Sequence, residues 1–373
     1  MKLILSVDAI NPPLTGVGRY AWELVTRLSN RPELESLRFY LNGRWIADPA
    51  SLLQEAHAAK PKRRRKVKVP KWYTDWRSSS AFRSSIFHSP NYFLPAHSGI
   101  AVATIHDLSI IKFPETHPME RRQKFDRELS GTLDRASHLI TPSEAIRKEV
   151  IEYFSWPADK VTAVANGVAP SFNSKQSSEI LIPTLSRCGL RPNEYALCVS
   201  TLEPRKNIGA LLRAYSRLSE TLRARYPLVL AGHKGWLSES LHDSIDKGRS
   251  EGWLHYLGFV PEADLPALYA GARAFLYPSL YEGFGLPVLE AMASGVPVLT
   301  SDSSSLPEVS NGAALLIDPN DDDLLYKGID RILLDDDWRA LAKARGLEVA
   351  ARFSWERCIE QTMAVYTRLS PAL

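Results

Sequence analysis

The sequence predicts an α/β protein made of two doubly wound, Rossmann-like domains that face an interdomain cleft. Two consecutive runs of short β-type segments alternate with amphipathic helical segments, and several strands end in polar or turn residues. A chain of 373 residues is also long enough for about two domains. Its 45% hydrophobic and 24% charged residues are ordinary for a soluble globular protein.

The first run predicts six strands, and polar residues such as Asp8 and His106-Asp107 follow them. Open α/β sheets hold ligands at the carboxyl ends of their strands, so these are positions where a site is expected. The expected strands are Leu3–Val7, Leu37–Leu41, Ser85–His88, Ala101–Ile105, His138–Thr141 and Val161–Ala165.

The second run predicts six more strands. Asn207 is expected to cap the helix after the first of them, and Asp264 and Gly271 are expected to bound a later helix. The expected strands are Tyr195–Ser200, Leu228–Ala231, His255–Gly258, Ala274–Tyr277, Val296–Thr300 and Ala314–Ile317.

The domain boundaries follow from composition. Pro170–Asn193 is polar and rich in Ser, Lys, Gln and Pro, so it is the predicted linker. We expect one domain at residues 1–175, a second at 176–353, and a final helix at 354–373 that packs back toward the first domain.

The most informative stretch is Glu282-Gly-Phe-Gly-Leu-Pro-Val-Leu-Glu290, which places one acid before a Gly-rich loop and a second acid on the helix that follows. Pro287 suits the first turn of a helix, and Gly283 and Gly285 let the backbone approach a ligand. A helix N-terminus offers unpaired N–H groups and a positive dipole end to a phosphate. Glu290 can accept hydrogen bonds from ligand hydroxyls. The combination predicts a nucleotide-sugar site.

A basic segment, Glu203-Pro-Arg205-Lys206-Asn207, lies between a predicted strand and a helix N-terminus. Two cations beside helix N–H groups make a diphosphate clamp. The alternative interpretation is a solvated basic turn. Its place at the carboxyl end of the second domain's first strand favours the clamp.

Two further candidates lie in the first domain. Gly16-Val-Gly18 formally opens a dinucleotide fingerprint, but Ala9–Thr15 separates it from the strand, where that fingerprint needs a tight turn. We therefore interpret it as a Gly loop that lines a cleft and touches phosphate or acceptor, the alternative being a flexible connection. His106 is placed either to contact a sugar or to be structural.

Other features limit the class of protein. Three widely spaced cysteines predict a reducing compartment and no disulfide framework or metal site. The acidic runs at 321–323 and 335–337 are interpreted as helix caps rather than metal ligands. No signal peptide or apolar run near 18 residues is present. The basic stretch at residues 60–77, with interleaved aromatics, suits an anionic membrane surface, nucleic acid, or a solvated loop.

Taken together, these motifs resemble family 4 of the retaining glycosyltransferases, which have the two-domain GT-B fold. The resemblance covers nearly the whole chain: the E-x7-E motif appears as Glu282 and Glu290, the basic segment as Thr201–Asn207, and the N-terminal Gly loop as Thr15–Arg19. Shorter matching pieces are His88–Tyr92, Thr104–Asp107, Thr141–Glu144 and Ala165–Val168.

The resemblance implies metal-independent transfer of a sugar from a nucleoside diphosphate donor with retained configuration. The first domain would bind the acceptor and the second the donor. Arg205 and Lys206 would neutralise the leaving diphosphate, Glu282 would face the donor sugar and Glu290 would hold the ribose. Backbone N–H groups of Phe284, Gly285 and Leu286 would contact sugar and phosphate, the segment Gly258–Val260 would flank the base, and His106 would contact the sugar.

One position departs from the pattern. Many members carry an Arg where this chain has Thr201, so that either Arg205 supplies the missing charge or the clamp is weaker.

The variant of the basic segment in this chain is similar to bacterial mannosyl- and rhamnosyltransferases of surface-polysaccharide (O-antigen lipopolysaccharide) assembly. This implies a GDP-mannose or GDP-rhamnose donor, a lipid-linked glycan acceptor, and a cytoplasmic location at the inner face of the membrane. The alternatives are a GT-B enzyme that uses UDP- or ADP-sugars and, more distantly, a dinucleotide- or nucleic-acid-binding protein.

Overall fold

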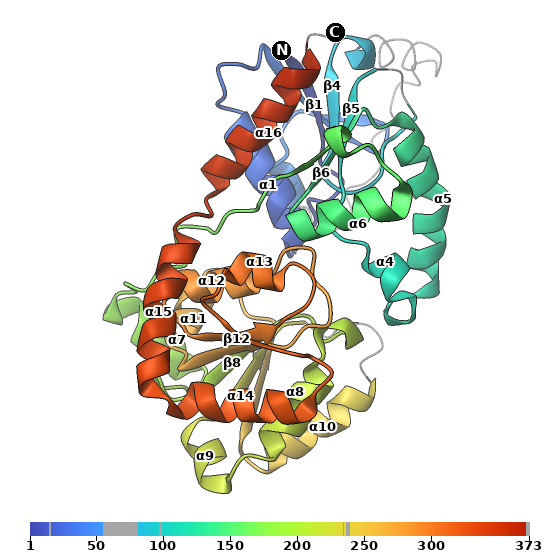
Figure 1. Cartoon of the computed structure of the whole chain (residues 1–373). Coiled ribbons are helices and arrows are strands. Elements are labelled where there is room, and N and C mark those ends of the chain that lie inside the picture. The colour runs from blue at the N-terminus through green and yellow to red at the C-terminus, as the bar shows by residue number, and fades with distance from the viewer. Residues whose placement is uncertain (15, 55–80, 97–98, 234, 236–238, 371–373) are drawn as a thin grey trace, which may run out of the picture. The chain divides into compact units, whose positions relative to one another are not determined.

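The chain divides into two compact units, each with its own parallel sheet (Figure 1). The computed structural model describes residues 1–14, 16–54, 81–96, 99–233, 235 and 239–370. The first unit contains residues 1–108, 123–166 and 355–373, and the second contains residues 109–122 and 167–354. The predicted α/β class with two Rossmann-like halves is confirmed.

The sheet of the first unit has the strand order β3-β2-β1-β4-β5-β6-β7, with every pairing parallel except that of β2 and β3. Asn42 and Gly43 join β2 to β3 with positive φ angles of 45° and 86°, as a two-residue hairpin turn requires. This edge hairpin was missing from the sequence prediction, although Asn-Gly is a strong local signal for it. The strands are β1 Lys2–Ser6, β2 Ser36–Leu41, β3 Arg44–Ile46, β4 Ile86–Ser89, β5 Ala101–Thr104, β6 His138–Thr141 and β7 Val161–Ala163.

Helices α1 and α16 of the first unit pack against each other, as Figure 1 shows. The ring of Tyr20 on α1 lies 6.4 Å from that of Trp355 on α16, and the Tyr366 hydroxyl of α16 lies 2.5 Å from Nδ1 of His88 on β4. The C-terminal helix therefore belongs to the first unit. The helices are α1 Gly16–Leu28, α2 Ser51–Gln54, α5 Met119–Arg135 (whose first turn is grouped with the second unit), α6 Glu144–Phe154 and α16 Trp355–Leu369, with a 3₁₀ turn, η3, at Ala158–Lys160.

The sheet of the second unit is parallel throughout, in the order β10-β9-β8-β11-β12-β13. Its strands are β8 Ala196–Val199, β9 Leu228–Ala231, β10 Leu254–Gly258, β11 Ala274–Tyr277, β12 Val298–Ser301 and β13 Leu315–Ile317. The segment before α5 is grouped with this unit: it holds α4 Ser109–Lys112 and the 3₁₀ turn η2 Pro114–Thr116, and the ring of Phe113 lies 5.4 Å from that of Tyr281.

Helices cover both faces of this second sheet: α12 and α13 lie on one face in Figure 1, and α8, α10 and α14 lie on the other. The remaining bounds are α7 Ser178–Arg187, η4 Pro204–Lys206, α8 Ile208–Ser216, α9 Glu220–Arg225, α10 Glu239–Ser250, α11 Leu265–Ala270, α12 Leu286–Ala293, α13 Leu306–Ser310, α14 Asp322–Leu334 and α15 Asp336–Ala350.

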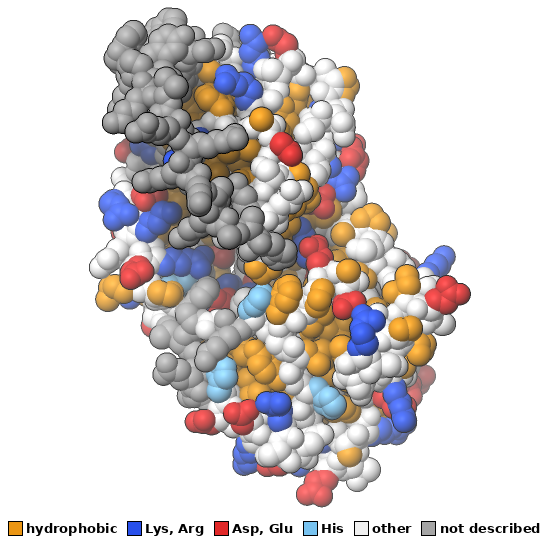
Figure 2. Space-filling view, turned by 180° about the vertical axis from the view of Figure 1, so that it is seen from behind, with side chains coloured by type: hydrophobic (Ala, Val, Ile, Leu, Met, Phe, Trp, Pro, Cys, Tyr) orange, Lys and Arg blue, Asp and Glu red, His pale blue; other side chains and the backbone are white. Residues whose placement is uncertain are grey.

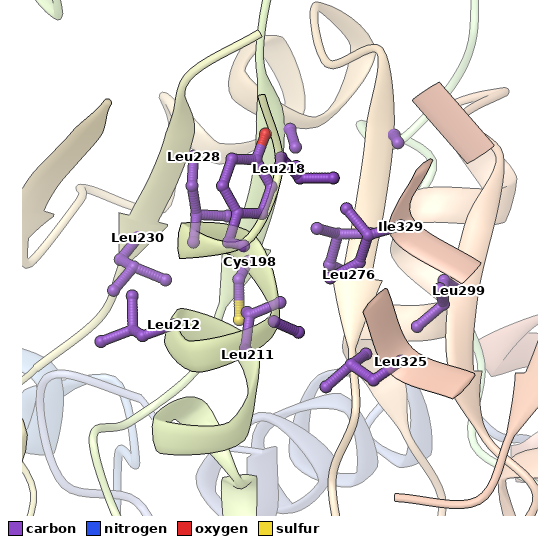
Figure 3. Packing of buried hydrophobic residues seen from close by; sticks show 14 of the residues in the cluster. Cys198, Leu211, Leu212, Leu218, Leu228, Leu230, Leu276, Leu299, Leu325 and Ile329 are labelled. Carbon is purple, nitrogen blue, oxygen red and sulfur yellow. The ribbon is translucent and has the colours of Figure 1, made fainter. Parts of the chain in front are cut away.

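The hydrophobic core of the second unit lies between its strands and the helices α8 and α14 (Figure 3). Leu228, Leu276 and Leu299 project from three strands, and Leu211 and Ile329 face them from the two helices. All five are fully buried. Strands covered on both faces are apolar along their whole length, which is why these segments read as continuous hydrophobic runs in the sequence.

Three local predictions in the second unit were wrong in whole or in part. The expected linker contains the helix α7, whose buried residues Thr184 and Leu185 give it an apolar face that the polar composition concealed. Asn207 has a left-handed backbone, and its side chain donates to the Pro319 carbonyl (2.7 Å) instead of capping α8. Asp264 and Gly271 bound α11 as predicted, but the Asp264 carboxylate accepts from Arg187 (2.8 Å) rather than from the amides of α11.

The acidic runs do cap helices as predicted. The carboxylate of Asp321 accepts from the backbone N–H groups of Asp323 and Leu324, and that of Asp335 accepts from the N–H of Trp338. A carboxylate at these positions satisfies amides that lack a partner within the helix and favours the positive end of the helix dipole.

The surface carries charges of both signs, in keeping with a formal net charge of only +4. On the face drawn in Figure 2, basic and acidic side chains are interspersed wherever the atoms are coloured. No helix within the described part of the chain is long and apolar enough to cross a membrane.

Candidate functional site

Three loops of the second unit meet at the carboxyl edge of its sheet. Residues 200–207 follow β8, residues 278–285 follow β11, and residues 302–305 follow β12. Because β8, β11 and β12 are parallel neighbours, their carboxyl ends lie side by side, where open α/β sheets bind ligands.

The carboxylate of Glu282 lies at the centre of this edge. Its Oε1 accepts from Lys206 Nζ (2.6 Å), the Ser279 hydroxyl (2.7 Å) and the Tyr277 hydroxyl (2.8 Å), and its Oε2 lies 3.4 Å from Nη1 of Arg205. Only 7% of the residue is exposed. Burial by itself would raise the pKa of Glu282, but the charges of Lys206 and Arg205 and the hydrogen bonds outweigh it, so the pKa lies below its ordinary value.

Burial and the negative charge of Glu282 shift the pKa of the neighbouring Tyr277 in the same direction. Burial raises the pKa of Tyr277 well above the ordinary value, and the negative charge of Glu282 adds to the effect. Tyr277 therefore stays protonated and donates to Glu282, while its oxygen accepts from Lys206 Nζ at 3.0 Å.

Arg205 is held by acceptors on two loops. Its Nη2 donates to Glu203 Oε1 (3.0 Å), and its Nη1 donates to the Tyr281 carbonyl (2.5 Å) as well as approaching Glu282. Lys206 Nζ lies 3.9 Å from the same oxygen of Glu203. The two cations and the two carboxylates, all largely buried, cancel in formal charge.

The Gly-rich loop leads into helix α12 as the sequence predicted. Gly285 has a φ of 101°, a left-handed conformation that favours glycine, and Pro287 occupies the first turn. A Cβ at Gly285 would also come within 2.8 Å of the Leu306 side chain. Gly283, Phe284, Gly285 and Leu286 form the approach to this helix, and Glu290, on its second turn, is 6% exposed.

Three consecutive serines after β12 hold the same loop from the other side. The Ser303 hydroxyl donates to the Leu280 carbonyl (2.9 Å), the Ser304 hydroxyl accepts from the Glu282 N–H (2.9 Å), and the Ser305 hydroxyl donates to the carbonyls of Glu282 and Phe284 (both 2.9 Å). Sequence reasoning missed these serines, Tyr277 and Ser279, and it gave no role to Glu203. Each follows or ends a strand at the carboxyl edge, which is the signal that could have found them.

The structure thus brings Arg205, Lys206 and Glu282 into one network and places the Gly283–Leu286 loop directly after it. Val260 follows β10 on the same edge, two strands from β8. Within the described residues, no group of three or more His, Cys, Asp or Glu side chains is placed to hold a metal ion.

The other candidates belong to the first unit. His106 follows β5 and is buried, and its Nε2 lies 2.6 Å from the Pro90 carbonyl, so that this nitrogen carries the proton. Burial lowers its pKa, against the opposing effects of that carbonyl and Asp107, which keeps the ring neutral. Gly16 begins α1, and a Cβ at Gly18 would lie 2.9 Å from the Ala9 carbonyl oxygen, so Gly18 serves a close backbone approach. The basic stretch at 60–77 lies outside the described residues.

Comparison with known proteins accounts for both halves of the chain. Residues 14–172 match the family described as Glycosyltransferase Family 4, and residues 190–349 match Glycosyl transferases group 1. The O-antigen chain mannosyltransferase B of Escherichia coli is 41% identical over 99% of this chain and 100% of its own length. The serotype-specific mannosyltransferase WbdA of the same species is 36% identical over 63% of this chain but only 29% of its own length.

Solved structures agree in fold. WaaG, a glycosyltransferase involved in lipopolysaccharide biosynthesis, superposes with a TM-score of 0.71 at 16% identity, covering 98% of this chain and 99% of WaaG. Anabaena HepE in complex with UDP-glucose gives a TM-score of 0.73 at 19% identity, over 99% of this chain and 100% of HepE. With both family matches and a full-length relative at 41% identity, this chain belongs to the family 4/group 1 glycosyltransferases of the GT-B fold.

Proposed function

We propose that this glycosyltransferase moves a hexose, mannose in the first place and rhamnose as the second candidate, from a GDP-sugar to a lipid-linked glycan in bacterial O-antigen assembly. The observation that carries the proposal is the Lys206–Glu282 pair at the start of the α12 loop, in a chain 41% identical to an O-antigen mannosyltransferase over its full length. The transfer would retain the anomeric configuration.

The roles of the residues follow from charge and position. Lys206 supplies a cation for the leaving diphosphate, and the backbone N–H groups of Phe284, Gly285 and Leu286, at the start of α12, supply further donors. Such preorganised groups stabilise charge that develops in the transition state without the help of a metal ion. Glu290 accepts from the ribose hydroxyls, the segment at Val260 flanks the base, and Glu282 borders the donor sugar.

The first unit would bind the acceptor. We propose that the Gly16/Gly18 loop and His106 face the transferred sugar and its acceptor. The neutral ring of His106, with the proton on Nε2, has its other nitrogen as an acceptor for a sugar hydroxyl. We further propose that the protein works at the inner face of the cytoplasmic membrane, where a lipid-linked acceptor is found, and that residues 60–77 contact anionic lipid.

A donor panel tests the activity. Purified protein is given GDP-mannose, GDP-rhamnose, UDP-glucose or ADP-glucose with a mannose-containing lipid-linked acceptor, and nucleoside diphosphate release is measured. GDP-mannose is expected to give the highest kcat/KM, with retained configuration in the product. Preferred turnover of UDP-glucose would replace the GDP assignment, and an absence of transfer with every donor would refute the proposal.

The substitution Lys206→Met tests the site. Removing one preorganised group of this kind lowers kcat by about 10²- to 10³-fold. Lys327→Met, at an exposed position on α14, is the matched control and should leave kcat within about twofold of the wild type, as surface changes have small effects. Equal activity of the two variants would remove Lys206 from the proposed site.

Liposome binding tests the membrane contact. Binding to vesicles with anionic lipid should exceed binding to neutral vesicles and fall when Arg63, Arg64 and Arg65 are changed to Gln, because each basic residue near the surface contributes about 1 kcal/mol. Equal binding to both kinds of vesicle would contradict it.

A further inference from the structure

The side chain and backbone of Arg205 make contacts within the protein that the binding of a phosphate would not require. Its guanidinium meets a carboxylate of its own loop, Glu203, and both a carbonyl and a carboxylate of the loop after β11, those of Tyr281 and Glu282. Its own carbonyl accepts from the Leu280 N–H (2.9 Å) and from the Ser279 hydroxyl (3.1 Å). Side chain and backbone of one residue therefore tie the β8 loop to residues 279–282.

The environment of Lys206 differs from that of Arg205. Glu282 and Tyr277 take two of the three N–H donors of its ammonium group, which leaves one donor for a ligand. An ammonium group on a flexible stem acts as a point charge, whereas the two terminal nitrogens of the Arg205 guanidinium meet three acceptors on two loops. Both side chains are 11% exposed, so the difference lies in bonding and not in accessibility.

We propose that Arg205 is a positioning residue of the donor site and not a ligand of the diphosphate. It holds residues 279–282 against the β8 loop, so that Glu282, Lys206 and the first turn of α12 keep their relative places. Its two terminal nitrogens are engaged by Glu203, Glu282 and the Tyr281 carbonyl, so it does not replace the cation that is absent at Thr201, and Lys206 is the side-chain cation of the diphosphate site. This inference rests on the proposed donor site.

An uncharged contact to the same loop, made by Ser304, supports this role. The hydroxyl of Ser304, which carries no charge, accepts from the Glu282 N–H. Ser304 follows β12 and Arg205 follows β8, so the two residues hold the loop after β11 from its two neighbouring strands. The two residues should therefore act on the same quantity, the placement of residues 279–282. Ser304 has a φ of 52°, so Ser304→Gly removes the hydroxyl while keeping a backbone that glycine readily adopts.

The experiment compares Arg205→Lys, Arg205→Met and Ser304→Gly with the wild type. The matched control is Arg213→Met on α8 of the same unit, which removes an exposed ion pair with Asp322 of α14. For each protein we would measure kcat and KM for the donor, the Kd of GDP at about 0.05 M and 0.5 M salt, and the thermal unfolding midpoint.

If Arg205 positions the loop, Lys cannot replace it, because a single ammonium group cannot reach three acceptors. Arg205→Lys and Arg205→Met should then both lose about tenfold to a hundredfold in kcat, and Ser304→Gly about tenfold, as misplacement by about 1 Å costs up to about 10²-fold. The ratio of GDP affinities at the two salt concentrations should stay that of the wild type in all three variants and fall only in Lys206→Met. The control should resemble the wild type.

The proposal is overturned if Arg205→Lys keeps the wild-type GDP affinity and kcat while Arg205→Met loses both, or if Arg205→Met reduces the salt dependence as Lys206→Met does. Should the Arg205 variants unfold, Ser304→Gly decides alone: unchanged kcat contradicts the positioning role. Should the wild type bind another nucleoside diphosphate instead of GDP, the same comparison is made with that ligand. Failure of the GDP assignment is then distinguished from failure of the positioning role of Arg205. If it binds none, non-additive unfolding midpoints in an Arg205→Lys/Ser304→Gly cycle support the tie between the loops, and additive ones refute it.

Discussion

The substitution Glu282→Gln probes the buried charge network with almost no change of shape. The amide keeps an oxygen for Lys206, Tyr277 and Ser279, but it removes the negative charge that lies 2.6 Å from Lys206 Nζ and 3.4 Å from Arg205 Nη1. Removing one partner of a buried ion pair costs about 3–5 kcal/mol. Arg205 retains Glu203 at 3.0 Å, so we expect the lower end, about 3 kcal/mol of unfolding free energy.

Thermal unfolding followed by calorimetry measures this cost. For a unit of roughly 200 residues, 1 kcal/mol shifts the midpoint by about 2–4 °C, so Glu282→Gln should lower it by about 6–12 °C. The control is Asp322→Asn, which breaks an Arg pair of 2.8 Å that is substantially exposed and should cost less than about 1 kcal/mol. A midpoint shift for Glu282→Gln no larger than that of the control would refute the network.

The pH dependence gives an independent check of the same reasoning. The folded-state pKa of Glu282 lies below its ordinary value of 4.5, so its stabilising contribution is present above pH 4.5 and is lost as the pH falls through the folded-state pKa. The difference in stability between the wild type and Glu282→Gln should therefore shrink in acid. A difference that grew as the pH fell would contradict the assigned charge state.

Three further predictions concern other parts of the chain. Glu290→Gln should raise the donor KM by about tenfold to a hundredfold with a smaller effect on kcat, because hydrogen bonds to a charged group contribute about 1.5–3 kcal/mol; an unchanged KM would remove Glu290 from the ribose site. Burial, followed by the nearby His106, lowers the pKa of His88 from 6.5 to about 3, so stability is present above pH 6.5 and is lost as the pH falls toward 3. Between pH 7.5 and 5.5, His88→Gln should accordingly lose about 1.4 kcal/mol less than the wild type in urea unfolding, and parallel curves would contradict this. Gly18→Ala should lower the unfolding midpoint, because its Cβ would lie 2.9 Å from the Ala9 carbonyl oxygen and this clash should outweigh a helix-propensity gain of about 1 kcal/mol. A raised midpoint would show that the backbone at Ala9 shifts to accommodate the added methyl group.

Most of the fold could be predicted because its signals are local. The β9 and β11 strands, at Leu228–Ala231 and Ala274–Tyr277, have the predicted bounds, since buried parallel strands are short apolar runs between turns. The loop-to-helix transition at Gly285 is equally local, as a positive φ and a first-turn proline are properties of neighbouring residues. The failures also have local causes: α7 contains Pro183, a residue that disfavours a helix interior, and its buried residues are Thr184 and Leu185.

The sequence by itself determined that the chain forms two Rossmann-like halves, that a Gly-rich loop precedes helix α12, and that Glu282, Lys206 and Arg205 lie near the carboxyl ends of strands. Only the tertiary structure decided what these side chains do to one another. Lys206 and Glu282 are 76 positions apart, and their contact depends on β8 and β11 being neighbours in the sheet. The same adjacency places acceptors of the loop after β11 around the guanidinium of Arg205. A buried charge needs such partners, and no pattern along the sequence indicates which neighbouring loop provides them.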